Sequence, residues 1–405
     1  MTPEQPAVTY ATILEAAARL AGCIERTPTR FSRALSRIAG AEIWVKYENQ
    51  HETGAFKERG ALNKVLQLTA DERRRGVIAA SAGNHARALA HHAQAQGVPT
   101  TIVMPRGTPN VKVEQTRARG AIIVLEGDTF DDAYAHALKL REERNLVFVH
   151  PFDDAAVIAG QGTAALEMLA DAPELDMLVI PIGGGGLIAG MSIAAKALKP
   201  NIRIIGVEAA MYPSFAARTR GESVRAGGQT IAEGIAVKQV GDLPFALAQP
   251  LIEDIIAVEE SYFERAIALY VGAERTVAEG AGAATLAALL SSPEKFRGAK
   301  VGLVLSGGNI DARLLASVLE RSLVREGRIA VLRFIGDDRP GILAVVTRII
   351  GDKGGNILQV AHHRMTLDAP AKGVEFDIEI ETRDAQHTGE IIEAMTTAGY
   401  PARCL

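Results

Sequence analysis

Between residues 77 and 150 the chain alternates short apolar runs with helical patterns, and this alternation limits the fold more than any other feature. The apolar runs are typical of buried strands, and the segments between them have the length and periodicity of helices. Such βα repeats build parallel sheets. The sequence therefore predicts strands at 77–81, 100–104, 121–125 and 146–150, separated by helices at 84–96, 109–119 and 129–143.

The same alternation returns later in the chain. Further strands are expected at 178–182, 202–208 and 301–306, with helices at 187–198 and 311–325. Because each set of repeats can form its own parallel sheet, two α/β layers are expected within residues 1–325.

The segment after Arg325 has a different pattern. It predicts a strand at 328–335, a turn at 337–341, a helix at 342–353, strands at 357–366 and 373–382, a helix at 385–398 and a short final strand. This βαββαβ order over residues 328–405 is typical of a ferredoxin-like module. Glu326 and Gly327 are the expected hinge between the two parts.

Composition and charge exclude several classes of function. The 405 residues carry a net charge of -4, and no basic run with interleaved aromatic residues is present, so no nucleic-acid partner is expected. Apolar stretches are interrupted by Gly, Pro or charge before they reach membrane-spanning length, and the first residues lack a secretory pattern. We expect no membrane partner and a cytoplasmic location. Two cysteines, Cys23 and Cys404, form neither a disulfide framework nor a CxxC metal site, and no protein-bound metal is expected.

Two polar residues lie where chemistry is expected. Lys57, within HETGAFKERGALNKV (51–65), stands between small residues and a helix start, although a lysine alone is usually a solvated surface residue. Asn84, within SAGNHARA (81–88), lies where a strand meets a helix. Backbone N–H groups at such a turn bind anions, and the Asn84 amide can donate to a phenolate oxygen. The simpler interpretation is that Asn84 or Ser81 only caps the helix.

Two glycine-rich segments follow strands in the second α/β region. Gly183 to Gly186 lie directly between a strand and an apolar helix, where glycines permit close approach and the helix N-terminus attracts a phosphate. No GKS or GKT follows, which disfavours a nucleoside triphosphate, and GxGxxG is absent, which leaves a nicotinamide cofactor as a weaker alternative. In SGGN (306–309), the Ser306 hydroxyl can reach a ring nitrogen, or the segment is simply a turn.

Taken in order, these motifs resemble those of the fold-type II pyridoxal-phosphate enzymes, and most closely the threonine dehydratases, also called threonine ammonia-lyases. The resemblance covers about residues 1–325 and implies a smaller subdomain, about 53–152, inserted in the larger one. It rests on YENQHETGAFKERGA, SAGNHA, HPFDD (150–154), AGQGT (159–163), GGGGL (183–187), EGIAV (233–237), EGAGA (279–283) and SGGN.

The resemblance implies a role for each matching residue. Lys57 would be the catalytic residue that forms the Schiff base with pyridoxal 5'-phosphate. The residues implied in cofactor binding are Phe56, Lys57, Asn84, Gly183, Gly184, Gly185, Gly186, Leu187, Gly234, Glu279 and Ser306. Those implied around the substrate are Ser81, Ala82, Gly83, His85 and Phe152.

The chain departs from the serine racemases of the same family at two places. Those enzymes resemble SSGNH, in which a second serine acts as acid and base on the opposite face, whereas this chain has Ala82 there. Their metal site is poorly matched, because Glu208 is present but Tyr212 and Ser214 supply no second carboxylate.

Residues 328–405 resemble an ACT domain, with DDRPGIL (337–343) and GGNIL (354–358) as the matching segments. An amino-acid effector is expected at residues of these two turns, and a purely structural dimerisation module is the alternative. The expected effector-binding residues are Asp338, Gly341, Ile342, Leu343, Asn356, Ile357 and Leu358.

The resemblance implies deamination of L-threonine to 2-oxobutanoate and ammonia, with L-serine to pyruvate as a side activity. Lys57 would remove the proton from the substrate Cα. Another fold-type II elimination or replacement, for example of serine or hydroxyaspartate, and a non-catalytic amino-acid sensor are the alternatives. A homo-oligomer, dimer or tetramer, is expected, while the effector and the choice between isoleucine synthesis and threonine breakdown stay open.

Overall fold

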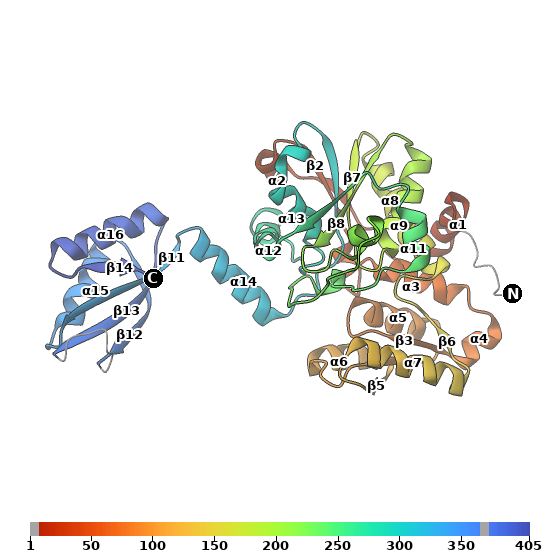
Figure 1. Ribbon diagram of the computed structural model, residues 1–405, viewed down its shortest axis with the longest axis horizontal. Coiled ribbons are helices and arrows are strands. Elements are labelled where there is room, and N and C mark those ends of the chain that lie inside the picture. Colours follow the sequence, from red (N-terminus) through yellow and green to blue (C-terminus); the bar gives the residue numbers. More distant parts are fainter. Residues whose placement is uncertain (1–7, 365–371) are drawn as a thin grey trace. The chain divides into compact units, whose positions relative to one another are not determined.

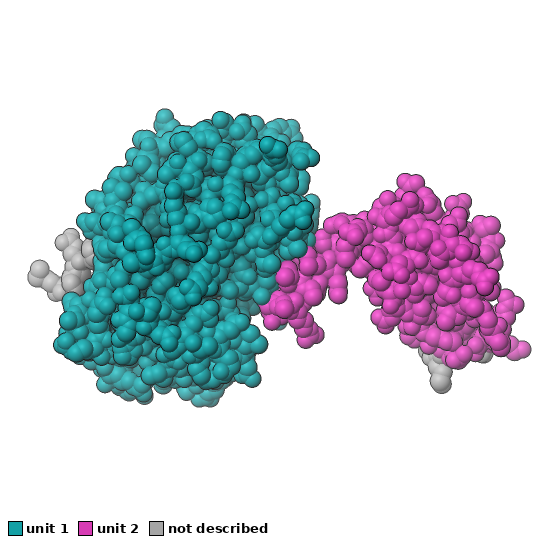
Figure 2. Space-filling view, turned by 180° about the vertical axis from the view of Figure 1, so that it is seen from behind, with its two compact units in different colours: residues 1–310 teal, residues 311–405 magenta. Residues whose placement is uncertain are grey.

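A computed structural model describes residues 8–364 and 372–405. The chain divides into two compact units, residues 1–310 and 311–405, which Figure 2 shows in different colours. Each unit has its own hydrophobic core. The helix expected at 311–325 is grouped with the C-terminal unit.

The larger layer of the first unit is a six-stranded sheet in the order β1-β2-β10-β7-β8-β9. All neighbouring strands are parallel except the pair β1 and β2, which is antiparallel. Central strands such as β7 are buried along their whole length, because helices cover both faces of a parallel sheet. The strands are β1 (Thr29–Phe31), β2 (Glu42–Tyr47), β7 (Met177–Pro181), β8 (Arg203–Ala209), β9 (Asp254–Val258) and β10 (Lys300–Leu305).

Helices and short 3-10 turns surround this sheet. The helices are α1 (Tyr10–Leu20), α2 (Arg33–Ala39), α8 (Ala155–Asp171), α9 (Gly186–Leu198), α10 (Ser214–Thr219), α11 (Asp242–Ala248), α12 (Glu260–Glu274) and α13 (Ala284–Ser291). The 3-10 turns are η1 (Glu48–Gln50), η2 (Glu233–Ile235) and η3 (Pro293–Lys295). In the described part of the chain, no helix is long and apolar enough to cross a membrane.

The smaller layer is a four-stranded parallel sheet in the order β5-β4-β3-β6. Its strands are β3 (Val77–Ala80), β4 (Thr100–Met104), β5 (Ile122–Leu125) and β6 (Val147–Phe148). The helices of this part are α3 (Lys57–Leu66), α4 (Ala70–Arg75), α5 (Asn84–Ala95), α6 (Asn110–Arg117) and α7 (Phe130–Arg144). Because α3 packs against both α5 and α8, it joins the two layers (Figure 1).

The C-terminal unit contains α14 (Ala312–Arg325) followed by a βαββαβ module with an antiparallel sheet in the order β12-β13-β11-β14. Its elements are β11 (Ile329–Asp337), α15 (Ile342–Asp352), β12 (Asn356–His363), β13 (Gly373–Glu381), α16 (Ala385–Thr397) and β14 (Ala402–Cys404). Phe334 and Phe376 stack in the core, with ring centroids 4.9 Å apart. This architecture agrees with the ferredoxin-like prediction.

Candidate active site

Lys57 is the first residue of α3, the helix that joins the two layers. Its Nζ donates a hydrogen bond of 2.7 Å to the carbonyl oxygen of Pro151 and lies 5.1 Å from the centroid of the Phe56 ring. The next residue, Phe152, packs its ring against the backbone of Gly184. The fold therefore brings the Lys57 amine to the glycine-rich loop that lies more than a hundred residues later in the sequence.

Burial changes the charge state of the groups around Lys57. It lowers the pKa of the Lys57 ammonium to about 8, although the carboxylate of Glu279 opposes this shift. Burial, and secondly the charge of Lys57, lower the pKa of His85 to about 3, so this imidazole is neutral at ordinary pH. The His85 Nε2 lies 3.0 Å from the carbonyl oxygen of Val149. Because a carbonyl only accepts, Nε2 carries the proton and Nδ1 remains an acceptor.

The loop from Ser81 to Gly83 connects β3 to α5. Gly83 occupies the N-cap position without a side-chain capping bond, so neither Ser81 nor Asn84 caps the helix. Instead the Asn84 side chain leaves the helix, and its Nδ2 donates to Oε1 of Glu279 at 2.6 Å. The simple capping interpretation of this motif is therefore wrong.

The four glycines lie between β7 and α9, as the sequence predicted. Gly185 has a φ of +95°, a conformation that favours glycine. A Cβ on Gly184 would lie 2.2 Å from carbons of the Phe152 ring. Within the described residues, the backbone N–H groups of Gly183 to Leu187 donate no hydrogen bond. They are free donors at the N-terminus of a helix, where its dipole favours an anion.

Ser306 follows the last strand of the large sheet, and its carbonyl oxygen accepts from the Phe56 N–H at 3.0 Å. Its hydroxyl donates to the carbonyl oxygen of Ala281 at 3.3 Å. Gly234 lies on the other side of the glycine loop, since a Cβ on Gly183 would lie 3.0 Å from the Gly234 carbonyl oxygen. Seven separate segments of the chain thus contribute to this region: 56–57, 81–85, 149–152, 183–187, 234, 279–281 and 306.

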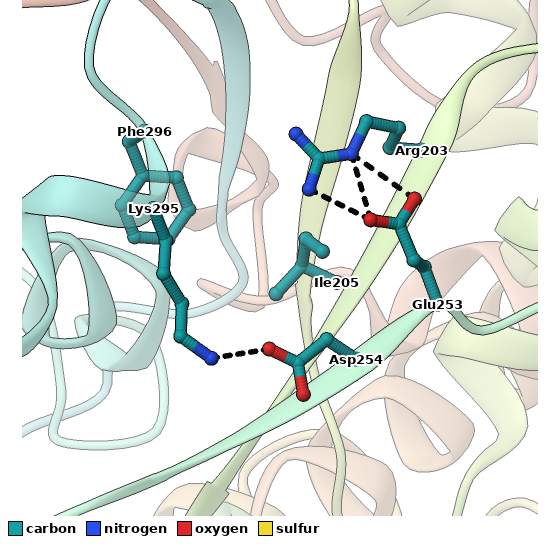
Figure 3. Close-up of a pocket in the computed structure, with 6 residues that line it drawn as sticks. All are labelled: Arg203, Ile205, Glu253, Asp254, Lys295 and Phe296. Atoms are coloured by element: carbon teal, nitrogen blue, oxygen red, sulfur yellow. Dashed lines mark hydrogen bonds and ion pairs between the residues drawn. The ribbon is translucent and has the colours of Figure 1, made fainter.

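A cavity of about 340 Å³ at another edge of the large sheet contains none of the predicted site residues. Figure 3 shows its lining residues, which are Arg203, Ile205, Glu253, Asp254, Lys295 and Phe296. Arg203 pairs with Glu253 and Lys295 pairs with Asp254, so each charged group already has a partner. Arg203 and Asp254 begin strands β8 and β9, whereas the glycine loop and Ser306 follow the ends of β7 and β10. In parallel sheets the ligand site lies at the carboxyl ends of the strands, which favours the region around Lys57.

Two protein-family models match this chain. Residues 20–307 match the model described as pyridoxal-phosphate dependent enzyme, and residues 330–396 match the ACT domain. The chain belongs to the pyridoxal-phosphate-dependent enzyme family. The predicted fold-type II architecture with a C-terminal ACT domain is confirmed.

Individual relatives in this family include threonine enzymes. The chain is 43% identical over 398 residues to an L-threonine ammonia-lyase of Thermotoga maritima, which covers 98% of this chain and 99% of the relative. A solved structure of threonine deaminase isoform 2 from Solanum lycopersicum is 35% identical, has a TM-score of 0.73 and covers 78% of this chain and 88% of that one. Maize serine racemase has the same TM-score of 0.73, is 33% identical and covers 79% and 99% of the two chains.

The residues of the cleft fit the cofactor of this family. A Schiff base needs an amine that loses its proton readily, and the buried Lys57 amine, with its lowered pKa, supplies one. A phosphate needs several N–H donors, and Gly183 to Leu187 offer theirs without any partner among the described residues. Pyridoxal phosphate is therefore the cofactor of the chain, as the family model indicates.

The lowered pKa of Lys57 predicts how fast the cofactor-free protein takes up pyridoxal phosphate at different pH values. Only the neutral amine attacks the aldehyde, and half of it is neutral near pH 8. The uptake rate should rise about fivefold from pH 7 to pH 8 and level off above about pH 9. Stopped-flow absorbance would measure it. A rate that still rises about tenfold per unit up to pH 10 would mean that Lys57 titrates like an ordinary lysine.

Glu208, the carboxylate considered for a metal site, has backbone partners. Its two oxygens accept from the N–H groups of Phe215 and Ala216, at 2.6 and 3.0 Å. These donors lie at the start of α10, while burial raises the pKa of Glu208 to about 7. Within residues 8–364 and 372–405, no group of three or more His, Cys, Asp or Glu side chains is placed to hold a metal ion.

The predicted effector residues of the ACT domain fall into two groups. Ile342, Leu343 and Ile357 pack into the core of the module, and Ile342 is only 6% exposed. The side chains of Asp338, Asn356 and Leu358 are exposed, and Gly341 is the N-cap residue of α15. Asp338 accepts from Arg364 at 3.0 Å, and Asn356 donates to Glu381 at 3.3 Å. The apolar residues that were expected to cover an effector therefore contribute first to the core.

Sequence reasoning missed three residues of the cleft. Pro151 contributes only a backbone oxygen, which leaves no signal in the sequence. Arg87 is 8% exposed and lies one helical turn after Asn84, within the motif already identified. Asn309 is the last residue of SGGN, a segment in which only Ser306 was predicted to bind the cofactor. The sequence signal for Asn309 was its place directly after two glycines, in a segment that was already predicted to lie at the site.

Proposed function

We propose that this chain is an L-threonine ammonia-lyase that converts L-threonine to 2-oxobutanoate and ammonia, with L-serine to pyruvate as a side activity. The observation that carries the proposal is the Lys57 amine, which has a lowered pKa and lies beside a glycine loop with free N–H groups. Relatives named for threonine deamination support the choice of substrate. Serine lacks only one methyl, which apolar pockets distinguish by roughly 1–3 kcal/mol.

When bound, pyridoxal phosphate draws electrons from the substrate and so makes the proton on Cα acidic. In the proposed reaction the neutral Lys57 amine removes that proton. Its hydrogen bond to the Pro151 carbonyl holds Nζ in place, and its pKa of about 8 lets it give and take a proton near neutral pH. The β-hydroxyl then leaves as water, and a second water releases ammonia and the keto acid.

Other residues around Lys57 would bind and orient the substrate and the cofactor. Backbone N–H groups of the Ser81–Gly83 loop, which ends at a helix N-terminus, suit the substrate carboxylate. Gly183 to Leu187 would hold the cofactor phosphate, Asn84 its phenolate oxygen and Ser306 its ring nitrogen. Phe56 lies beside the Lys57 amine, and Phe152 covers the glycine loop. Ala82 supplies no hydroxyl on the opposite face, which disfavours racemisation.

The direct test is a keto-acid assay on the pyridoxal-phosphate-loaded protein with four substrates: threonine, serine, hydroxyaspartate and O-acetylserine. We expect 2-oxobutanoate from threonine at the highest kcat/KM and pyruvate from serine. A preference for hydroxyaspartate or O-acetylserine would assign another reaction of the same family. Bound cofactor without turnover of any of the four would make the chain an amino-acid sensor.

We also propose that an amino acid, isoleucine or valine, binds the ACT domain near Asp338–Leu343 and Asn356–Leu358 and changes catalysis. Residues 1–310 already contain every group that the chemistry uses, so the separate module is free to regulate. The exposed Asp338, Asn356 and Leu358 lie next to the turn before α15 and at the start of β12. A homo-oligomer is part of the proposal, since among the described residues β12 and β14 form the two edges of their sheet and an edge strand can pair with another chain. The proposed location is the cytoplasm.

The expected regulatory effect is a change of roughly 5- to 150-fold in the threonine concentration that gives half-maximal rate. Calorimetry and threonine kinetics, each with and without isoleucine or valine, would measure binding and coupling. Asp338→Ala should weaken the response, whereas Asp352→Ala, at the far end of α15, should leave it unchanged. If neither amino acid binds and the kinetics are identical in its presence, the module is structural.

A further inference from the structure

We propose that Asn309 is a positioning residue that fixes the carboxamide of Asn84, so that a single N–H of this amide remains available to the cofactor. The inference rests on the proposed function only in that Asn84 contacts pyridoxal phosphate. Asn309 lies directly after Ser306-Gly307-Gly308, on the loop that leaves strand β10.

The carboxamide of Asn84 is held at both ends. Its Nδ2 donates to Oε1 of Glu279 at 2.6 Å, and its Oδ1 accepts from Nδ2 of Asn309 at 2.8 Å. The Nδ2 of Asn309 donates its second hydrogen to the carbonyl oxygen of Thr53 at 2.7 Å. Thr53 lies in the segment that leads into Lys57, so Asn309 links the lysine segment to the asparagine loop.

Donor and acceptor counts allow only one orientation of these two amides. An amide nitrogen has two hydrogens to donate, and those of Asn309 face two acceptors, the Thr53 carbonyl and the Asn84 Oδ1. Turning the Asn84 amide over would place its oxygen against the Glu279 carboxylate and its nitrogen against the Asn309 nitrogen. The two facing nitrogens would repel each other whatever the charge of Glu279, and the two oxygens would repel each other whenever Glu279 is ionised. Asn84 therefore keeps its nitrogen toward Glu279, with one N–H left for a ligand.

The backbone is built around the Asn309 side chain. Gly54 has a φ of +78°, and a Cβ there would lie 2.7 Å from Oδ1 of Asn309. The Gly308 N–H donates to the carbonyl oxygen of Gly54 at 2.9 Å, which docks the two loops together. A larger residue at position 54 would push the Asn309 amide away from Asn84. The close approach of the loops thus fixes the place of Asn309 before any ligand binds.

Glu279 is the second support of Asn84, and its own position is also determined. The Glu279 N–H donates to the carbonyl oxygen of Gly307 at 3.1 Å, and a Cβ on Gly307 would lie 2.5 Å from Oε1 of Glu279. Arg87 shares a helix face with Asn84, because it lies three positions later in the helix. Its Nε has no hydrogen-bond partner among the described residues, and the Glu279 carboxylate is the charge that stabilises its cation.

The test uses the full-length protein with the side chain of Asn309 changed in two ways. Asn309→Ala removes the donor. Asn309→Asp keeps the size but presents an oxygen to two acceptors, which should turn the Asn84 amide away from its native orientation. Asn49→Ala is the matched control, because Asn49 also donates through Nδ2, to Thr276 and Val277, and within the described residues no hydrogen bond joins it to Asn84. Thermal unfolding would establish that each variant is folded. If the Asn309→Ala variant does not fold, the Asn309→Asp variant alone is used for the test.

Two measurements on pyridoxal phosphate itself decide the result. We expect both Asn309 variants to raise the dissociation constant of the cofactor about tenfold. We also expect the pH titration of its visible absorption band to move upward by about one unit, since the phenolate oxygen loses a donor and holds a proton more tightly. The Asn49 variant should change neither. Weaker binding with an unmoved titration would show a merely structural role and would overturn the inference, as would variants identical to the parent. A parent that binds the cofactor but does not deaminate threonine refutes the proposed function alone.

Discussion

Replacing Lys57 with alanine is expected to lower threonine turnover by at least about 1,000-fold, because the anchor of the cofactor and the base at Cα vanish together. The fold should survive. Alanine is the most favourable residue in a helix, and within the described part of the chain the Lys57 side chain makes a single hydrogen bond, to the Pro151 carbonyl oxygen. Keto-acid formation and the visible band of the cofactor would be measured together.

Lys64→Ala is the control for this experiment. Lys64 lies on the same helix and pairs with Asp154 at 2.6 Å, and it is not among the residues around the Lys57 amine. The Lys64→Ala variant should keep the turnover of the parent. Borohydride should still attach the cofactor covalently to Lys57 in this variant. A Lys57 variant with more than trace activity, or one that borohydride still labels, would show that another group is the Schiff-base amine.

Gly184→Ala is expected to raise the dissociation constant of pyridoxal phosphate by about 100-fold or more. The added Cβ would lie 2.2 Å from carbons of the Phe152 ring, a distance that real contacts do not reach. Either the ring moves or the loop does, and both changes disturb the free N–H groups of Gly183 to Leu187. Overpacking of this kind also costs roughly 1–3 kcal/mol of folding stability, which denaturant unfolding would detect.

A second substitution tests the physical cause. Phe152→Leu removes ring atoms that meet the new Cβ, so the double variant should recover part of the lost cofactor affinity. Gly107→Ala is the control, since a Cβ there meets nothing within 4 Å and the residue has no left-handed conformation. If Gly184→Ala binds the cofactor as tightly as the parent, the glycine loop does not hold the phosphate.

Local patterns in the sequence were sufficient for most strands of the two parallel layers and for the order of the described elements of the C-terminal module. The end of the strand expected at 357–366 lies outside the described residues. The strand at Thr100–Met104 and the helix at Asn84–Ala95 match the expected 100–104 and 84–96 almost residue for residue. The strand expected at 146–150 is limited to Val147–Phe148, because the chain turns at His150, whose ring nitrogen accepts from the Asp153 N–H at 2.8 Å.

The longest helix of the chain, α8, was not predicted. Its residues from Val157 to Ala165 are all buried, so the helix has no polar face and the amphipathic period that reveals a helix is missing. A Cβ on Gly160 would lie 2.5 Å from the Arg59 carbonyl oxygen, which shows how closely α8 crosses α3. Its glycines serve a crossing between helices that no local pattern can indicate.

The sequence by itself determined most of the parallel strands, the glycine loop before α9 and the segment that carries Lys57, because these depend on residues close together in the chain. Only the tertiary structure decided which groups act on that lysine and on Asn84. The pKa of Lys57 depends on burial and on Glu279, and the orientation of Asn84 depends on Glu279 and Asn309, 195 and 225 residues away in sequence. Charge and hydrogen bonding act through space, so these properties arise only when the two layers pack together.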